Sequence, residues 1–180
     1  MNTLHKFVDD MRATWGPLTT QMVAGCQQHL DTLLNTPVSE PWLATLHLEA
    51  AAQHELYRDP QYGFVLLAHT EHAGLYRPPH DHGRGWVIYA VQQGAIEMST
   101  YARVEDAGGQ VKLVKRGSTV LCAGQTQLYL PGDIHDTRCV AGPALLFRFT
   151  ERDLKKEDRE ARRLTRYVEQ AGDWVPEARV

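Results

Sequence analysis

The chain has 180 residues, a formal net charge of −3 at pH 7 and a sequence pI near 6.3. This length suits one domain with a substantial core, and the charge provides no basic face for nucleic acid and no polybasic membrane patch. No window approaches the roughly 20 apolar residues of a membrane-spanning helix, and the first residues lack the apolar core of a signal peptide. Three widely spaced cysteines, Cys26, Cys122 and Cys139, predict free thiols in a reducing compartment. We therefore expect a soluble cytoplasmic protein.

Residues 1 to 54 repeat apolar side chains at intervals of three and four, which is typical of amphipathic helices. The spacing predicts three helices, over about residues 4–15, 20–34 and 39–51. Thr19 or Thr20 is expected to cap the second helix, and the hydroxyl of Ser39 to cap the third. The side chains that we expect the third helix to bury are Trp42, Leu43, Leu46, Leu48 and Ala51. All three helices are predicted to pack on the outside of a barrel.

From Leu56 the apolar period changes to two, and Gly and Pro punctuate short apolar runs. The pattern predicts strands over residues 62–70, 75–82, 86–92, 95–104, 111–114, 119–122, 127–130, 134–140 and 144–149. Such a series of short strands is typical of a sandwich or a closed barrel.

After Thr150 acidic and basic residues alternate as far as Gln170. Alternating signs predict a helix with one solvated face, stabilised by pairs at i and i+4. The apolar residues through which this helix is expected to pack against the rest of the domain or against another subunit are Leu154, Ala161, Leu164, Tyr167 and Val168.

Two histidines, His80 and His82, occupy positions i and i+2 of a predicted strand, so their side chains project from the same face. A third histidine, His135, follows the turn Leu130-Pro131-Gly132-Asp133. Three neutral imidazoles suit Fe, Ni, Cu or Zn and leave coordination positions open for water, substrate or dioxygen. Burying three imidazoles in an apolar barrel requires hydrogen-bond partners or an ion, which favours a metal site over three structural histidines. The histidines expected to be structural are His5, His29, His47, His54, His69 and His72, of which His72 lies nearest the motif.

Around these histidines the chain resembles the two sequence motifs of the cupin superfamily. The residues that fall in register with the motifs are Gly74, His80, His82, Gly94, Gly124, Gly132 and His135. Three positions depart from them: Val87 replaces the glutamate ligand, Pro131 lies one place late, and Cys139 replaces an asparagine. Without the glutamate, the chain resembles the three-histidine cupins, and the run Pro-His-Asp-His resembles the thiol dioxygenases, which include the cysteine and mercaptopropionate dioxygenases.

The resemblance covers about residues 56 to 150 and implies a mainly β fold, a cupin double-stranded β-helix or jelly-roll barrel. In a single domain over 1–180, residues 1–54 would form a helical flank, 55–150 the barrel, and 151–180 a C-terminal helix and tail. The implied function is Fe(II)-dependent oxidation of a small carboxylate-bearing thiol by O2, in a monomer or homodimer. The metal ligands would be His80, His82 and His135, and the same set accepts Ni, Zn, Mn or Cu.

Three further residues are candidates for binding the substrate. In the thiol dioxygenases an arginine on an early strand clamps the substrate carboxylate, and Arg58 would take that place unless it is a surface residue of the turn before Pro60. Arg148 falls within the segment where those enzymes carry a Ser-x-His-x-Tyr triad, which is absent here. An inward Arg148 would favour an anionic substrate but would not accept a proton. Tyr89 shares the face of His82 on a straight strand, and either bonds a metal-bound oxygen species or fills the barrel.

Other assignments stay open at the level of the sequence. Asp81 and Asp136 either orient a metal-binding imidazole or lie in turns and at the surface. Cys139 is either a soft ligand or a small buried hydrophobe. The absence of the triad favours a different cupin enzyme, such as a dioxygenase that cleaves a carbon-carbon bond, an isomerase or a hydrolase. A non-catalytic cupin that binds a metal or small ligand is the remaining alternative, and a barrel mouth plugged by large apolar side chains would support it.

Overall fold

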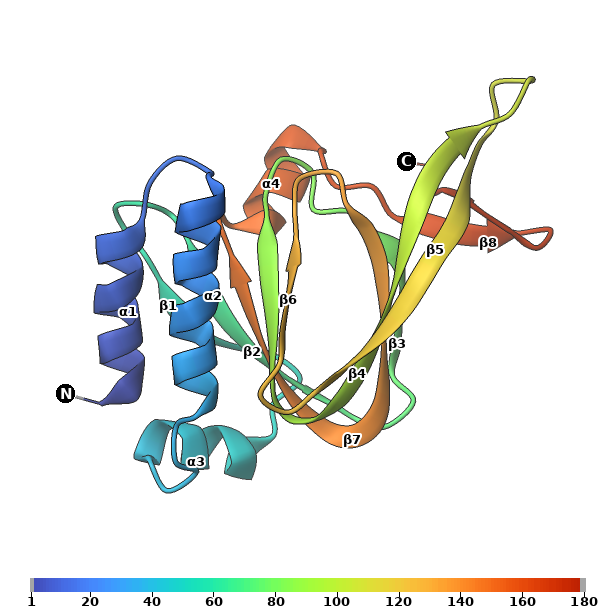
Figure 1. Cartoon of the computed structure of the whole chain (residues 1–180). Coiled ribbons are helices and arrows are strands. Elements are labelled where there is room, and N and C mark those ends of the chain that lie inside the picture. Colours follow the sequence, from blue (N-terminus) through green and yellow to red (C-terminus); the bar gives the residue numbers. More distant parts are fainter. Residues whose placement is uncertain (1, 179–180) are drawn as a thin grey trace.

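A computed structural model describes residues 2–178, which form a barrel of antiparallel strands flanked by helices (Figure 1). The helices are α1 (Thr3–Thr14), α2 (Thr20–Leu34), α3 (Pro41–Glu49) and α4 (Leu154–Ala161). The barrel strands are β1 (His54–Arg58), β2 (Val65–Glu71), β3 (Tyr76–His80), β4 (Val87–Glu105), β5 (Val111–Cys122), β6 (Thr126–Tyr129) and β7 (Ile134–Thr150). A separate hairpin, β8 (Tyr167–Gln170) and β9 (Asp173–Pro176), ends the described chain. The predicted mainly β jelly-roll fold with flanking helices is confirmed.

Strands β4 and β7 are the central strands of the barrel. They pair antiparallel from Val87 and Thr150 at one end to Tyr101 and Ile134 at the other. The second half of β7 also pairs with β2, whereas its first half pairs with β3. The two long strands therefore contribute to two opposed walls, one with β1, β2 and β6 and the other with β3 and β5.

Strand β7 changes the direction of its side chains along its length. His135 and Arg148 are an odd number of positions apart and would face opposite sides of a regular strand. Both nevertheless face the interior, because the His135 ring lies beside His82 and Arg148 pairs in register with the buried Tyr89. The alternation is broken in the middle of β7, where the β4–β7 register shifts.

The bend in the two long strands depends on a glycine at their crossing. Gly94 has a φ of 80°, and a Cβ there would collide with the carbonyl oxygen of Ala141 on β7. Only glycine satisfies both the left-handed backbone and the close approach.

Helices α1 and α2 lie side by side on one wall of the barrel, with α3 at one end of the pair (Figure 1). They bury one apolar face against Phe64, Phe147 and Phe149. Trp86 faces these helices and stacks on Trp15 with ring centroids 5.9 Å apart.

Of the two helix caps predicted from the sequence, one is present in the structure and the other is not. The Thr19 hydroxyl accepts from the amide of Met22, so it caps α2 as predicted. The predicted Ser39 cap of α3 is wrong, since α3 begins at Pro41 and the N-cap residue is Glu40, without a side-chain cap. The expected burial of Leu48 is also wrong, because it is 86% exposed.

The predicted strands were too short and too many. Three pairs of predicted strands are continuous as β4, β5 and β7, since the residues between them form bends rather than reversals. Strand β1, over His54–Arg58, was missed because its residues are largely exposed and show no apolar alternation.

The predicted C-terminal helix was too long. Helix α4 ends at Ala161, after which Arg162 adopts a left-handed conformation with φ 48°. The charge pattern concealed the β8–β9 hairpin, whose Tyr167 and Trp174 pack beside Leu113.

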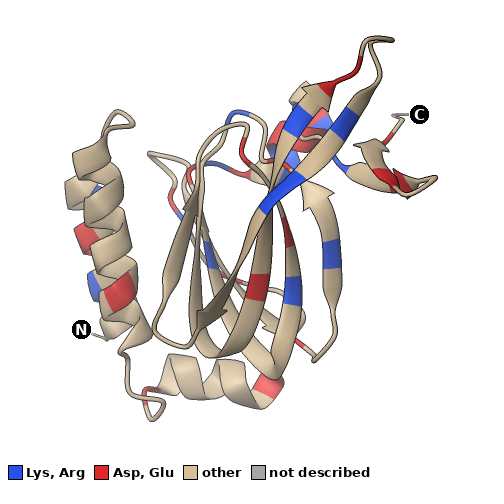
Figure 2. Ribbon diagram, turned by 45° about the vertical axis from the view of Figure 1, so that its right-hand side comes forward, with Lys and Arg blue, Asp and Glu red and all other residues tan. Residues whose placement is uncertain are grey.

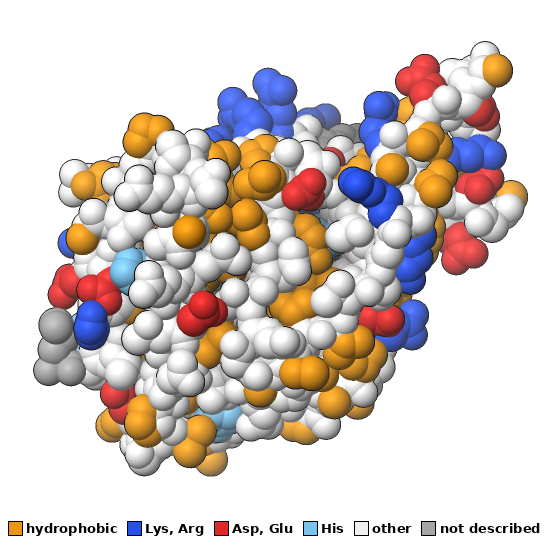
Figure 3. Space-filling model, in the orientation of Figure 1, with side chains coloured by type: hydrophobic (Ala, Val, Ile, Leu, Met, Phe, Trp, Pro, Cys, Tyr) orange, Lys and Arg blue, Asp and Glu red, His pale blue; other side chains and the backbone are white. Residues whose placement is uncertain are grey.

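Charged residues gather around α4 and on the β4–β5 hairpin that projects from the barrel (Figure 2). On the face shown in Figure 3 hydrophobic side chains are dispersed among polar ones. Between residues 2 and 178, no helix combines the length and apolarity needed to cross a bilayer.

Candidate metal centre

Three histidines meet inside the barrel. His80 ends β3 and pairs in register with His135 of β7, and His82 follows in the loop after β3. The ring centroids are 4.7 Å apart for His80 and His135, 5.0 Å for His82 and His135, and 5.3 Å for His80 and His82. One ring nitrogen from each residue lies within 4.8 Å of the other two. The structure thus brings together the three side chains that the motif spacing singled out.

The geometry of these rings suits a divalent metal ion. The Nε2 atoms of His82 and His135 are 3.4 Å apart. Bonds of about 2.1 Å at a tetrahedral angle would separate two ligand nitrogens by about 3.4 Å. The Nδ1 atom of His80 lies 2.9 Å from the carbonyl oxygen of Pro78, which can only accept, so Nδ1 donates and Nε2 keeps its lone pair. The three residues could therefore hold a metal, whose identity the ring geometry does not select.

Burial keeps the three rings neutral. His82 is 1% exposed and His135 is fully buried, while His80 is half-buried. Burial lowers the pKa of His82 and His135 well below the usual value, and the His80 ring and the Arg148 charge lower both further. The pKa of His80 is also lowered, first by burial. Neutral imidazole is the form that binds metal ions, so no proton has to be removed at neutral pH.

Two tyrosines contact the histidine cluster. The hydroxyl of Tyr89 lies 3.3 Å from Nε2 of His82 and 3.5 Å from Nε2 of His135. The ring of Tyr129, on β6, stacks on His135 with centroids 3.9 Å apart. Burial raises the pKa of both tyrosines, so each hydroxyl keeps its proton and can donate it in a hydrogen bond.

Arg148 supplies a positive charge to the interior. It pairs in register with Tyr89 on one side and with Leu67 on the other. Its Nε atom is buried without a hydrogen-bond partner, and no ion pair of Arg148 occurs among residues 2–178. The charge lowers the pKa of all three histidines, which puts it close enough to influence the cluster.

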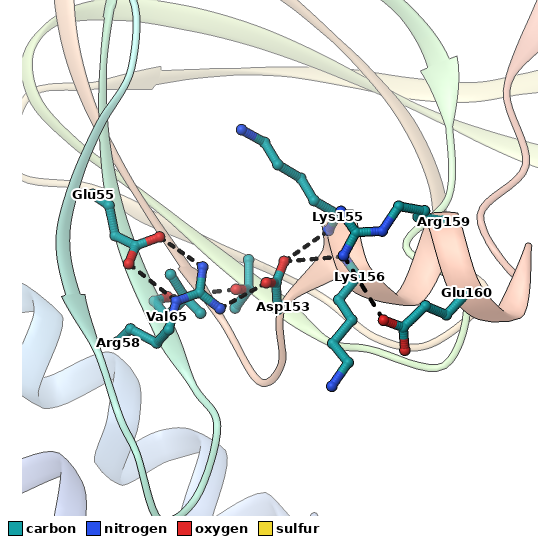
Figure 4. Close-up of polar contacts among 9 residues, drawn as sticks. Glu55, Arg58, Val65, Asp153, Lys155, Lys156, Arg159 and Glu160 are labelled. Carbon is teal, nitrogen blue, oxygen red and sulfur yellow. Dashed lines mark hydrogen bonds and ion pairs between the residues drawn. The ribbon is translucent and has the colours of Figure 1, made fainter.

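Arg58 is not brought to the histidines. Its guanidinium lies between Glu55, at 2.7 and 3.0 Å, and Asp153, at 2.7 Å, and the side chain is 43% exposed (Figure 4). These ion pairs connect β1 to the start of α4. Arg58 and Arg148 both line a small cavity of about 30 Å³. A role for Arg58 at the substrate stays a prediction, and its present contacts are those of a surface residue.

The aspartates next to the candidate ligands bond elsewhere. Asp81 accepts from the amides of Gly83 and Thr165. Asp136 accepts from two tyrosine hydroxyls, at 2.6 Å from Tyr101 and 3.1 Å from Tyr76. Neither aspartate bonds a candidate ligand within the described chain.

Other sequence candidates also lie outside the histidine cluster. Asp133 accepts from the amide of Leu130, so it closes its own turn. Cys139 is buried with its Sγ 3.4 Å from the carbonyl oxygen of Glu71 and behaves as a small hydrophobe. His72 is exposed.

Sequence reasoning missed three interior residues, Tyr129, His69 and Glu71. His69 was expected to be structural, yet it lies on β2 with Nε2 buried and unpartnered, as is Oε2 of Glu71. The alternation along β2 could have identified His69 and Glu71 as interior residues, because they continue the series of inward side chains that begins with Val65 and Leu67.

The C-terminal segment covers the opening of the barrel. Leu154 of α4 and Leu164 after it are both buried in the interior cluster that includes Val87 and Leu146. The segment is held to the histidine loop, because the amide of Thr165 donates to Asp81. Large apolar side chains therefore close this end of the barrel in the described conformation.

No protein-family model matches the chain, and no curated protein matches it in sequence. Similar solved structures include KdgF from Halomonas sp., with 18% identity and a TM-score of 0.42 over 54% of this chain and 74% of that chain. The Cnp3 cupin domain of Schizosaccharomyces pombe has 14% identity and a TM-score of 0.44 over 61% of this chain and 69% of that chain. A recombinant oxalate oxidase in complex with glycolate has 21% identity and a TM-score of 0.41 over 63% and 53%. Cupins are thus among the structures it resembles, but with TM-scores below 0.5 none of them identifies an activity for this chain.

Proposed function

We propose that the protein is an Fe(II)-dependent dioxygenase that oxidises a small thiol bearing an acid group. The observation that carries the proposal is the convergence of His80, His82 and His135 in a barrel whose interior also holds the Nε atom of Arg148, buried without a hydrogen-bond partner. Val87, at the place of the cupin glutamate, is fully buried and apolar, so the ligand set is three neutral imidazoles without a carboxylate. Three neutral ligands would leave coordination positions of the metal open. They would also leave its positive charge uncompensated, which favours the binding of anionic ligands.

Each interior side chain has a role that follows from its position. The three histidines would hold the iron, which supplies binding positions for a thiolate sulfur and for dioxygen. Arg148 would hold the acid end, because a half-buried guanidinium without a counterion gains from pairing with an anion. The Tyr89 hydroxyl, 3.3 and 3.5 Å from two candidate ligand atoms, can donate to a bound oxygen or sulfur atom. The apolar interior around Val91 and Leu146 excludes bulk water from these groups.

The proposal is tested by metal analysis of protein purified without oxygen, followed by oxygen uptake with cysteine, cysteamine and 3-mercaptopropionate. We expect about one iron per chain and uptake with a thiol that carries a carboxylate. The variant His135→Ala should lose the iron and the uptake. His72→Ala, at an exposed histidine outside the cluster, is the matched control and should keep both. Iron with no uptake for any thiol would reject the thiol reaction and leave another metal-dependent cupin enzyme as the reading.

A non-catalytic metal-binding cupin is a second candidate, favoured by the burial of Leu154 and Leu164 over the barrel opening. In that case the protein would bind a metal, and no thiol would change its coordination. Anaerobic absorption spectra of the cobalt-substituted protein decide between the two, because a thiolate bound to cobalt adds an intense charge-transfer band. The dioxygenase proposal expects that band to appear with the substrate thiol.

A further inference from the structure

We infer that His69 and Glu71 of β2 are specificity-determining residues, which select a substrate whose acid group is accompanied by an ammonium group. The inference rests on the proposed function and concerns the end of the substrate away from sulfur. It starts from three buried polar atoms that have no partner in the protein: Nε2 of His69, Oε2 of Glu71 and Nε of Arg148.

The direction of both side chains follows from the pairing of β2. Leu66 and Ala68 belong to the core cluster beneath the helices, so the alternate residues of β2 face the interior. Leu67 confirms this, because it pairs with Arg148, and Arg148 pairs with Tyr89. His69 and Glu71 continue on the same face, about 7 Å apart.

The imidazole of His69 is an acceptor of hydrogen bonds. Its Nδ1 atom lies 3.2 Å from the carbonyl oxygen of Ala52, which can only accept, so Nδ1 carries the proton and Nε2 the lone pair. His69 is 6% exposed. Burial, and next the charge of Arg148, lower its pKa to about 3, so the ring stays neutral at physiological pH.

The carboxylate of Glu71 adds a second acceptor and a negative charge. Glu71 is 2% exposed, and only its Oε1 atom has a partner, the Nε of Arg77 at 3.1 Å. Arg77 comes from β3, the strand that ends at His80, so Glu71 faces the wall that carries the candidate metal ligands. The Arg77 side chain is 46% exposed, and water therefore screens its charge more than that of Glu71.

These groups together suit a ligand with charges of both signs. Arg148 offers a donor for a carboxylate, and His69 and Glu71 offer acceptors for a group with several N–H bonds. An ammonium has three such bonds and a positive charge that complements Glu71. A plain mercapto acid would satisfy Arg148 but leave both acceptors of β2 buried without partners, which lowers its affinity.

Anaerobic calorimetric titration of the iron-loaded protein tests the inference, because it measures binding without turnover. The two probes are L-cysteine and 3-mercaptopropionate, which differ only by the ammonium group. We expect L-cysteine to bind about 10-fold more tightly, and Glu71→Gln and His69→Leu each to remove most of that preference while the affinity for 3-mercaptopropionate changes less than about 2-fold. Glu97→Gln, on the outer face of β4 beside Ser118, is the matched control and should keep the preference.

Two results would overturn the inference: equal or absent binding of the two thiols to the wild-type protein, or a preference that survives in both β2 variants. Either variant alone suffices for the test if the other fails to fold. The oxygen-uptake assay distinguishes a failure of this inference from a failure of the proposed function. Uptake with 3-mercaptopropionate, without tighter binding of L-cysteine, would uphold the proposed function and reject the roles of His69 and Glu71.

Discussion

The ring of Tyr129 lies almost parallel to that of His135, at 17° and with centroids 3.9 Å apart. Tyr129 comes from β6 and His135 from β7, two strands that both pair with β4. The Tyr129 ring packs against one face of the imidazole and fixes the plane of the His135 ring. It thereby fixes the direction of the Nε2 lone pair.

Removing this stack should weaken metal binding. We expect Tyr129→Leu to reduce the affinity for the metal about 10-fold, the low end of what is lost when a residue that orients a ligand is removed. Tyr129→Phe keeps the aromatic ring and should bind metal as the wild type does. Competition with a chromophoric chelator measures both affinities. Equal affinities for the Leu and Phe variants would show that the stack does not orient His135.

The hydroxyl of Tyr89 should contribute to turnover and not to holding the ion. Tyr89→Phe removes only the oxygen near His82 and His135, so the metal content should stay at the wild-type level. Loss of one donor aimed at the reacting atoms lowers kcat about 100-fold. Steady-state oxygen uptake, normalised to bound iron, checks this outcome. A variant as fast as the wild type would assign Tyr89 to filling the barrel.

The two arginines should behave differently towards an acid substrate. Arg148→Gln removes the half-buried charge and should raise KM for the preferred thiol by 10-fold or more, since a charge-assisted hydrogen bond contributes about 1.5–3 kcal/mol. Arg58→Gln breaks only the exposed pairs with Glu55 and Asp153, and should change KM less than about 2-fold. The same initial-rate series measures both. A larger effect from Arg58 would mean that the barrel opening rearranges when substrate binds.

Asp59 should make the stability of the protein sensitive to acid. Its side chain is fully buried and accepts from Arg12 at 2.6 Å and from the amides of Gln61 and Tyr62. Burial opposes the charged form, but these hydrogen bonds outweigh it and lower the pKa of Asp59. A lowered pKa in the folded state adds stability above the unfolded value of about 4, which is lost as the pH falls through the folded value.

Asp59→Asn should therefore reduce the free energy of unfolding by about 2 kcal/mol at pH 7 and flatten its fall below pH 4. Urea denaturation at pH 7, 5 and 3 gives both quantities. Asp9→Asn, at an exposed aspartate of α1, is the control and should alter neither. An unchanged acid slope in Asp59→Asn would contradict the role given to this carboxylate.

The sequence was sufficient for the parts of the fold that have a local cause. The period of three and four placed the N-terminal helices, and the i, i+2 spacing of His80 and His82 with the later His135 identified the cluster. What it did not reveal depends on contacts between distant segments. The sequence could not show which of Arg58 and Arg148 faces the interior, because it is the pairing of β7 with β2 and β4 that turns Arg148 inward.

The bend at Gly94 decides whether the histidine and the arginine of β7 work on one ligand. Regular alternation over the same number of residues would turn the guanidinium of Arg148 towards the helices, while His135 kept its place. The irregularity in the middle of β7 therefore couples the proposed metal site to the proposed acid recognition. A straightened β7 of the same length would keep the three histidines together and deprive the interior of its positive charge.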